Sequence, residues 1–295
     1  MNYSVLMSVY DKEKPEYLQQ SIESMLKQTV LPEQFVIVED GKLKPELEQI
    51  IQSYQLKYGK LFTILALPEN VGLARALDKG IAVCRNELIA RMDSDDISLP
   101  ERCEKELQLF ASDPELVIVG TNIDEFWNNP EEIKSSRVVP SEPEEIKKRM
   151  RRINAFNHPT VMYKKSEVIR CGGYGYISGN EDRDLFSRMV NSDCKARNIN
   201  ESLLLFRSNE DNYKRRKSFT RLKSSYRATF DILKRKHCTF FDAVYVIAGQ
   251  TFLFILPLPM MKFVSDKMLR QSKVSNVNKS IEQPKKKEYS VANKE

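Results

Sequence analysis

Residues 87–102 read ELIARMDSDDISLPER, a short apolar run followed at once by three aspartates within four positions. Such a run is typical of a strand that is buried inside a parallel sheet. Asp93 and Asp95 stand two positions apart, so in an extended segment both side chains point the same way and can share one task. Carboxylate oxygens are the ligands that Mg²⁺ and Mn²⁺ prefer. The stretch therefore predicts a metal or hydroxyl site at a strand end, unless Asp95 or Asp96 merely begins the turn before Pro100.

The same pattern recurs on both sides of this stretch. Short apolar runs, expected to be strands, occupy Tyr3–Val9, Phe35–Val38, Leu61–Leu67, Glu87–Met92 and Leu116–Val119. Between them, apolar residues recur at helical spacing over Pro15–Gln28, Pro45–Tyr58, Val71–Cys84 and Pro100–Phe110. The second half is less regular, with strands expected at Thr160–Tyr163 and Leu203–Phe206 around a helix at Asp182–Val190. Strand–helix alternation with short links predicts an α/β fold, with a mostly parallel sheet flanked by helices.

Polar residues gather just after the first four expected strands. They are Tyr10–Asp11, Glu39–Gly41, Glu69–Asn70 and Asp93–Asp96. Ligands of an open parallel sheet bind where loops leave the carboxyl ends of its strands, so these residues are the first candidates for a site. Asp40 can accept hydrogen bonds from a base or a ribose, although the neighbouring Gly41 also suits a plain turn. Because gathered carboxylates repel one another, their position favours a site for hydroxyl groups and a divalent metal.

Residues 70–75 open an expected helix, whose free amide groups and dipole favour an anion. Arg75 lies one turn into this helix, where it can contact a phosphate or remain an ordinary surface cation. The chain has neither a Gly-x-Gly-x-x-Gly sequence nor a Gly-Lys-Ser/Thr sequence. Neither a Rossmann dinucleotide site nor a phosphate-binding P-loop is therefore expected.

Two acids stand at the start of the helix expected over Asp182–Val190. Glu181 and Asp182 gain from the helix dipole, which is a sufficient structural explanation. The functional alternative is that Asp182 is a general base, a carboxylate that takes the proton of a substrate hydroxyl. A nearby Arg183 would keep that carboxylate ionised. His158 is one of only two histidines, and a lone histidine is more often a structural hydrogen-bonding group than a catalytic one.

The positive charge of the chain is local. The net charge is +6, but ten lysines and arginines stand against the single acid Asp231 between Asn212 and His237. Such a segment is expected to face a phosphate-bearing surface, either a membrane or a nucleic acid. Just beyond it, Ala243–Met261 carries no charged residue, but two prolines, a glycine and a glutamine interrupt it. This length is at the lower limit for a membrane span, and an interfacial or re-entrant segment is expected at least as much as a span, with a pair of core-packed helices as the alternative.

The composition indicates a folded protein in a reducing compartment. Apolar residues make up 41% of the chain and charged residues 30%, an ordinary balance for a globular domain. The five cysteines are odd in number and far apart, which argues against a disulfide framework and a zinc site. No secretory signal is seen at the start, so a cytoplasmic location is expected. We expect a catalytic domain over 1–210, a basic and apolar helical extension over 211–270, and a disordered tail over 271–295.

Eight blocks of sequence resemble the family 2 glycosyltransferases, which have the GT-A fold and build bacterial surface polysaccharides. The blocks are Ser8–Tyr10, Ile22–Thr29, Val38–Gly41, Asn70–Ile81, Ile89–Arg102, Val119–Asn122, His158–Met162 and Glu181–Leu185. The resemblance runs from about residue 3 to 207. It implies an inverting transfer of one sugar from a nucleotide-sugar, expected to be a UDP-sugar, to an acceptor hydroxyl. A lipid-linked glycan in capsule, O-antigen or exopolysaccharide synthesis is the acceptor that the resemblance implies.

The resemblance also implies roles for single residues. Asp182 matches the catalytic base, and Asp95 matches the aspartate that binds the divalent metal, Mn²⁺ or Mg²⁺. The expected donor-nucleotide residues are Tyr10, Asp40, Arg75 and Asp93, and the expected acceptor or phosphate contacts are Asp96, His158 and Glu181. The family usually has Asp-Asp-Gly-Ser where this chain has Glu-Asp-Gly-Lys at 39–42. The Gln-x-x-Arg-Trp sequence of processive synthases is missing, which favours single addition over polymerisation.

Two other functions compete with this one. A sugar nucleotidyltransferase would need a Gly-rich, basic loop after the first strand, where this chain has Tyr10–Glu13. A nucleic-acid binder would rest on the basic segment 214–236, but such a binder needs aromatic side chains on a stacking platform. The neighbouring apolar run favours lipid instead. We therefore expect peripheral contact of residues 212–264 with the inner face of the cell membrane and no nucleic-acid partner.

Overall fold

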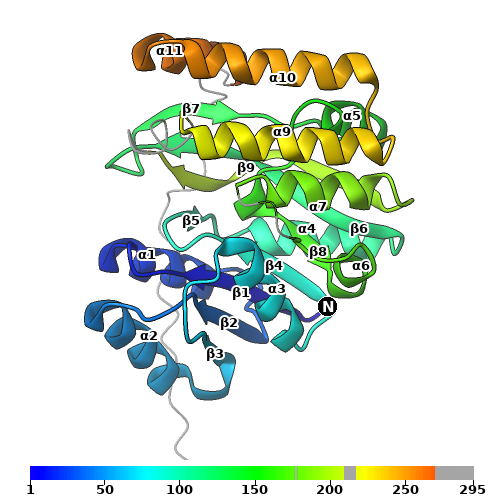
Figure 1. Ribbon diagram of the computed structural model, residues 1–295. Helices are drawn as coiled ribbons and strands as arrows, with labels where there is room; N and C mark the ends of the chain where they lie inside the picture. The colour runs from blue at the N-terminus through cyan, green and yellow to red at the C-terminus, as the bar shows by residue number, and fades with distance from the viewer. Residues whose placement is uncertain (176, 178, 209–216, 270–295) are drawn as a thin grey trace, which may run out of the picture.

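The computed structural model describes residues 1–175, 177, 179–208 and 217–269 (Figure 1). Its strands are β1 (Tyr3–Val9), β2 (Gln34–Glu39), β3 (Phe62–Ala66), β4 (Leu88–Met92), β5 (Ile97–Ser98), β6 (Leu116–Phe126), β7 (Ile133–Arg137), β8 (Met162–Lys164) and β9 (Lys195–Arg207). Its α-helices are α1 (Pro15–Leu26), α2 (Pro45–Tyr58), α3 (Leu73–Val83), α4 (Arg102–Ser112), α5 (Pro143–Met150), α6 (Lys165–Arg170), α7 (Glu181–Val190), α9 (Phe219–Lys234), α10 (Phe240–Ile255) and α11 (Leu258–Leu269). Short 3₁₀ turns cover Gly59–Leu61 and His158–Thr160. The strands form one sheet in the order β3-β2-β1-β4-β8-β6-β9-β5, with β7 paired to β6.

The first half of the sheet has the predicted parallel arrangement. Strand β1 pairs in parallel with β2 and β4, and β2 pairs in parallel with β3. The four strands match their predicted ranges to within one residue at each end, and α1 to α4 match to within two. The carboxyl ends of β1, β2 and β4 therefore meet at one edge, which is where the sequence gathers its acids.

The second half of the sheet is mixed rather than parallel. Strand β8 lies antiparallel between β4 and β6, whereas β6 and β9 pair in parallel. Both β6, with 11 residues, and β9, with 13, are much longer than predicted. Every side chain of β6 is buried, including the polar Asn122, Asp124 and Glu125. Because of these polar residues, the apolar sequence pattern predicts only the first part of the strand.

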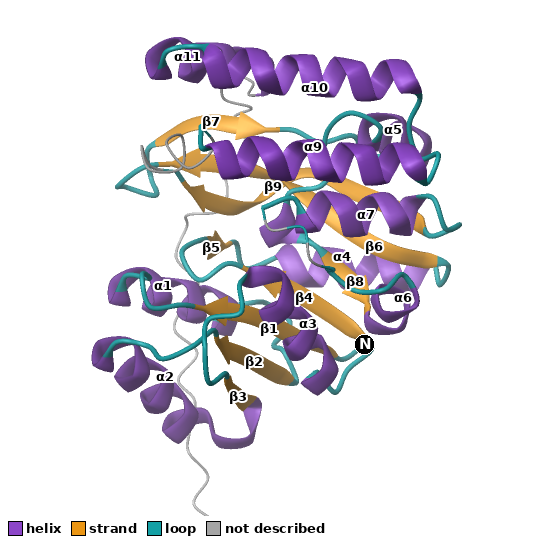
Figure 2. Ribbon diagram, viewed as in Figure 1, coloured by secondary structure: helices purple, strands orange, loops and turns teal. Residues whose placement is uncertain are grey.

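Helices cover both faces of the sheet (Figure 2), because alternate side chains of a strand point to opposite faces. On one face, Leu6 of β1 packs in a cluster with Leu77 of α3, and residues of α5, α6 and α7 extend that cluster. On the other face, Val5 and Met7 pack in a cluster with Ile22 of α1, together with residues of α2 and α4. The turns that follow the strands are therefore held in place by helices packed on both faces of the sheet.

Three helices follow the sheet and stack on its upper side in Figure 1, where α9 lies against α7 and α10 against α9. A capping box between Thr239 and Asp242 starts α10, and Pro257 separates α10 from α11. On α10 only Asp242, Ala243 and Val246 are buried. None of the helices in the described ranges is both long and apolar enough to cross a membrane.

The expected domain division and membrane contact stay predictions. In the described residues after β9, the chain forms the three helices α9, α10 and α11. The basic residues at 214–216 and the expected disordered tail at 271–295 lie outside the described residues.

Candidate active site

A cavity of about 670 Å³ opens at the carboxyl ends of β1, β2 and β4. It is lined by Ser8, Tyr10, Lys12, Glu13, Lys14, Tyr17, Asp40, Asn70, Gly72, Leu73, Asp93, Ser94, Asp95 and Phe206. The fold thus brings together four residues that the sequence predicts to bind the donor or the metal, namely Tyr10, Asp40, Asp93 and Asp95. Arg75 is exposed on α3 and does not line this cavity. Its predicted contact with the nucleotide stays a prediction.

The three aspartates that follow β4 form a tight cluster. One carboxylate oxygen from each of Asp93, Asp95 and Asp96 lies within 4.8 Å of the others. A turn at residues 94–95, not the extended segment expected from the sequence, gathers them. The Ser21 hydroxyl anchors the start of this turn by donating to the backbone oxygen of Asp93 at 2.6 Å. The buried Arg91 guanidinium pairs with the Asp93 carboxylate.

The cluster is electrostatically suited to a cation. Burial, together with the neighbouring charges of Asp93 and Glu13, raises the pKa of Asp95 to about 7. Asp96 is fully buried, and burial with the Asp95 charge raises its pKa well above the usual value. One oxygen of Asp96, Oδ2, has no hydrogen-bond partner in the described part of the chain. Hard oxygen ligands that repel one another fit Mn²⁺ or Mg²⁺, which would remove the repulsion.

Asp96 lines neither cavity of this site. The sequence predicts it as an acceptor or phosphate contact, but its Oδ1 accepts a 2.8 Å hydrogen bond from the backbone amide of Arg207. Its predicted contact with an acceptor or a phosphate stays a prediction.

Arg207, the last residue of β9, is a part of the site that sequence reasoning missed. Its Nε donates to the backbone oxygen of Asp95 at 2.8 Å and its Nη2 to Gln20 at 2.6 Å. The guanidinium also stacks 3.8 Å from the ring centre of Tyr17, which lines the cavity. An arginine directly after the predicted strand Leu203–Phe206 is the signal that could have identified it. Arg207 thus connects the turn that holds the aspartates with β9, in the second half of the sheet.

Asp40 has a structural task besides any contact with a nucleotide. Its Oδ1 accepts from the Val71 amide at 2.7 Å and its Oδ2 from the Gly72 amide at 3.1 Å. These two amides lie just before α3, and the sequence predicts that they are free to bind an anion. In the structure they donate to Asp40 instead. Each carboxylate oxygen has two lone pairs, so a second donor from a base or a ribose can still bind.

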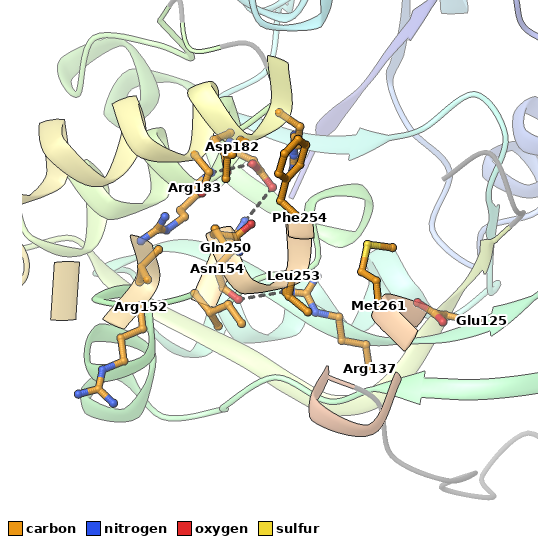
Figure 3. Close-up of a pocket in the computed structure, with 16 residues that line it drawn as sticks. Glu125, Arg137, Arg152, Asn154, Asp182, Arg183, Gln250, Leu253, Phe254 and Met261 are labelled. Carbon is orange, nitrogen blue, oxygen red and sulfur yellow. Dashed lines mark hydrogen bonds between the residues drawn. The ribbon is translucent and has the colours of Figure 1, made fainter. Parts of the chain in front are cut away.

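Asp182 lies at a second cavity of about 250 Å³, which Figure 3 shows in close-up. The half-buried carboxylate stands in the first turn of α7. Asn154 donates its side-chain amide to Oδ2 at 2.7 Å, and the Arg183 backbone amide donates to Oδ1 at 2.8 Å. Asp182 is therefore held in one orientation, as a base that takes a proton must be.

Glu181 and His158 are near Asp182 but line neither cavity. Glu181 is buried, and burial together with the Asp182 charge raises its pKa to about 7. Nε2 of His158 forms a 2.9 Å hydrogen bond with the Tyr174 hydroxyl. Burial and the Arg91 charge lower the pKa of His158 well below its usual value, so the ring is neutral. The predicted contacts of Glu181 and His158 with an acceptor or a phosphate stay predictions.

The sequence and the fold of this chain are similar to those of known proteins. Residues 4–172 match the family model described as glycosyl transferase family 2. The Escherichia coli UDP-Gal:alpha-D-GlcNAc-diphosphoundecaprenol beta-1,3-galactosyltransferase is 32% identical over 91% of this chain and 97% of its own length. The amylovoran biosynthesis glycosyltransferase AmsE of Erwinia amylovora is 31% identical over 90% of this chain and 98% of its own length. The mannosyltransferase PcManGT of Pyrobaculum calidifontis, solved with GDP-Man and Mn²⁺, shares the fold, with a TM-score of 0.60 at 13% identity over 90% of this chain and 73% of that one.

Proposed function

Because the chain belongs to glycosyl transferase family 2, we propose that it transfers one sugar from a UDP-sugar to a hydroxyl group of a lipid-linked saccharide, with inversion at the anomeric carbon. The chain is a glycosyltransferase. The name of the relative AmsE states that it acts in amylovoran biosynthesis. Synthesis of a capsule, an O-antigen or an exopolysaccharide is the corresponding role for this chain.

The observation that carries the proposal is the separation of the acids into two cavities. The cavity at Asp40, Asp93 and Asp95 has the size and the polar lining for a nucleotide-sugar. Asp182 stands at the other cavity, oriented by Asn154 and ready to take a proton. A single displacement needs one base on the acceptor and charge stabilisation on the leaving diphosphate, and it inverts the anomeric carbon.

Each residue then has a defined task. Asp40 and Tyr10 bind the nucleotide, and Asp93 binds the ribose or the sugar of the donor. Asp95 would hold Mn²⁺ or Mg²⁺, and the bound ion would stabilise the negative charge of the departing diphosphate. Asp182 accepts the proton of the acceptor hydroxyl as that oxygen attacks the anomeric carbon.

The donor and the stereochemistry can be tested with the purified chain. With a panel of UDP- and GDP-sugars and Mn²⁺, we expect one UDP-sugar to release UDP, slowly by hydrolysis and faster with a lipid-linked acceptor. Proton NMR of the product should show an anomeric configuration opposite to that of the donor. Retention of configuration would contradict the single displacement. Release of pyrophosphate from a nucleoside triphosphate and a sugar phosphate would instead favour a nucleotidyltransferase.

The outer side of α10 supports peripheral contact with a membrane. Phe241 is 79% exposed, Phe252 56% and Ile255 73%, an apolar surface that water disfavours. Exposed lysines and arginines of the neighbouring helix α9 add positive charge, which anionic lipids attract. We propose that this side of the molecule lies on the inner face of the cell membrane, where a lipid-linked acceptor is found.

Vesicle binding tests this contact. Changing Phe241, Phe252 and Ile255 together to serine should weaken binding to phosphatidylglycerol vesicles at least about tenfold, because each apolar side chain that leaves water contributes about 1.5–3 kcal/mol when fully buried. Leu56→Ser is the control, since Leu56 is 87% exposed on α2, far from α10 in Figure 1. Equal binding of the triple variant and the wild type in cosedimentation would contradict the proposal. A salt-dependent shift with RNA and none with vesicles would revive the nucleic-acid alternative.

A further inference from the structure

The cavity at Asp182 carries more positive charge than a sugar alone requires. Its lining includes four arginines, Arg137, Arg152, Arg183 and Arg221, against the two carboxylates of Glu125 and Asp182. Its other wall is apolar and comes from the C-terminal helices, through Leu222 of α9, Val246, Leu253 and Phe254 of α10, and Met261 of α11. A cavity lined by both arginines and apolar side chains fits a ligand that joins an anion to an apolar chain.

Arg183 is a buried cation without enough partners. Its side chain is 6% exposed, and Nη1 donates to the Thr229 hydroxyl at 3.3 Å. Its Nε and Nη2 have no hydrogen-bond partner among the described residues. The neighbouring Asp184 does not help, because it pairs with Arg188 and Arg235. Buried guanidinium groups are normally satisfied, so two unpartnered nitrogens on a residue that lines the cavity indicate a missing anionic partner.

Arg221 is placed beside the same cavity by a glycine. A Cβ atom added at Gly179 would lie 2.3 Å from Nη1 of Arg221, so a side chain at this position would displace the guanidinium from where it now lies. Gly179 also has a positive φ of 84°, which suits glycine. The other two arginines already have partners: Arg152 pairs with Asp242 at 2.6 Å, and Arg137 donates to the backbone oxygen of Asn154 at 3.0 Å.

We propose that this cavity is the acceptor subsite, in which Arg183 and Arg221 bind the diphosphate of the acceptor while its apolar chain leaves along α10 and α11. The proposal rests on the proposed function, since it places the acceptor sugar at Asp182. The cavity volume of about 250 Å³ suits the polar head of such an acceptor and leaves the chain outside. The chain then continues toward the exposed apolar side of α10, where the proposed membrane contact lies.

Equilibrium binding of farnesyl diphosphate to the full chain tests the subsite. Measured by calorimetry with the donor cavity saturated by UDP and Mn²⁺, farnesyl diphosphate should bind, whereas inorganic pyrophosphate and farnesol should each bind at least about tenfold more weakly. Arg183→Met and Arg221→Gln should each weaken farnesyl diphosphate binding by about tenfold or more, because each removes charge-assisted hydrogen bonds to the diphosphate. The affinity for UDP should not change.

Two controls separate this role from a structural one. Lys223→Gln removes the same charge from an exposed position of α9 that does not line the cavity, and it should bind farnesyl diphosphate as the wild type does. Arg183→Met should not lower the melting temperature, because methionine is of similar length and removes two unsatisfied donors. A lower melting temperature with unchanged binding would make Arg183 a structural residue and overturn its assignment.

The outcomes also distinguish this proposal from the proposed function. Farnesyl diphosphate binding that neither arginine variant changes, or that pyrophosphate matches, would overturn the subsite while UDP-sugar turnover could still stand. Binding that depends on both arginines, in a protein that consumes no UDP-sugar, would support the subsite and contradict the sugar transfer.

Discussion

Asp182→Asn is expected to lower kcat for sugar transfer by about 10²- to 10⁴-fold, the usual contribution of a general base. Asparagine has the same shape but cannot take the proton of the acceptor hydroxyl. It can keep one of the two hydrogen bonds that hold the side chain, to Asn154 or to the Arg183 amide. The donor cavity does not include Asp182, so the dissociation constant of UDP should change by less than about twofold. Steady-state transfer and UDP calorimetry on the same preparation measure both effects.

Glu181→Gln is the matched control, since it makes the same chemical change one residue earlier. Glu181 is buried and lines neither cavity. Because burial raises its pKa to about 7, ionisation above that pH has a cost in the folded protein, which the neutral glutamine avoids. The variant should therefore stay folded at pH 8 and keep most of its kcat. Full activity of Asp182→Asn, or an equal loss in both variants, would remove Asp182 from the role of base.

The first half of the fold could be predicted because its local pattern and its tertiary structure agree. The strands β1 to β4 are apolar throughout and alternate with helices whose apolar residues recur every three to four positions. In the second half the two disagree. Asn122 and Asp124 on β6 are buried and hydrogen-bonded by side chains from Asn200, Ser136 and Ser202, so burial does not coincide with apolar character. Only pairing with β9, distant in sequence, shows that these residues form a strand.

The residues of the candidate site also fall into two groups, those that the sequence predicts and those that only the structure reveals. Acids that follow a strand could be found from the sequence, because the carboxyl ends of parallel strands meet at one edge. The role of Arg207 could not, since its contact with Asp95 spans 112 positions of the chain. The second cavity could not be predicted either, because it is closed by α10 and α11, which begin at Phe240 and Leu258, far along the chain from the end of the last strand at Arg207. Local sequence thus predicts which residues can do chemistry, but not which of them share a cavity.

Asp95→Asn should remove the dependence of donor binding on Mn²⁺ and lower kcat/KM on the order of 10²- to 10³-fold, as expected when charge stabilisation of a leaving group is lost. In calorimetry, EDTA should weaken the binding of UDP to the wild type but not to the variant. Without metal, the variant should be at least as stable as the wild type, because it removes one of three carboxylates that repel one another. Mn²⁺ should raise the melting temperature of the wild type and leave that of Asp95→Asn unchanged.

Asp93→Asn, two positions away, should have the opposite effect on stability. It leaves the buried guanidinium of Arg91 without its ion-pair partner, and Nε and Nη1 of Arg91 have no other partner in the described residues. Removing one member of a largely buried pair is destabilising, here by about 1–3 kcal/mol because the Asp93 side chain is 30% exposed. Thermal melts in EDTA should therefore rank Asp95→Asn at or above the wild type and Asp93→Asn below it. The reverse order would mean that Asp95, not Asp93, neutralises the buried arginine, and that Asp93 is the better candidate for the metal ligand.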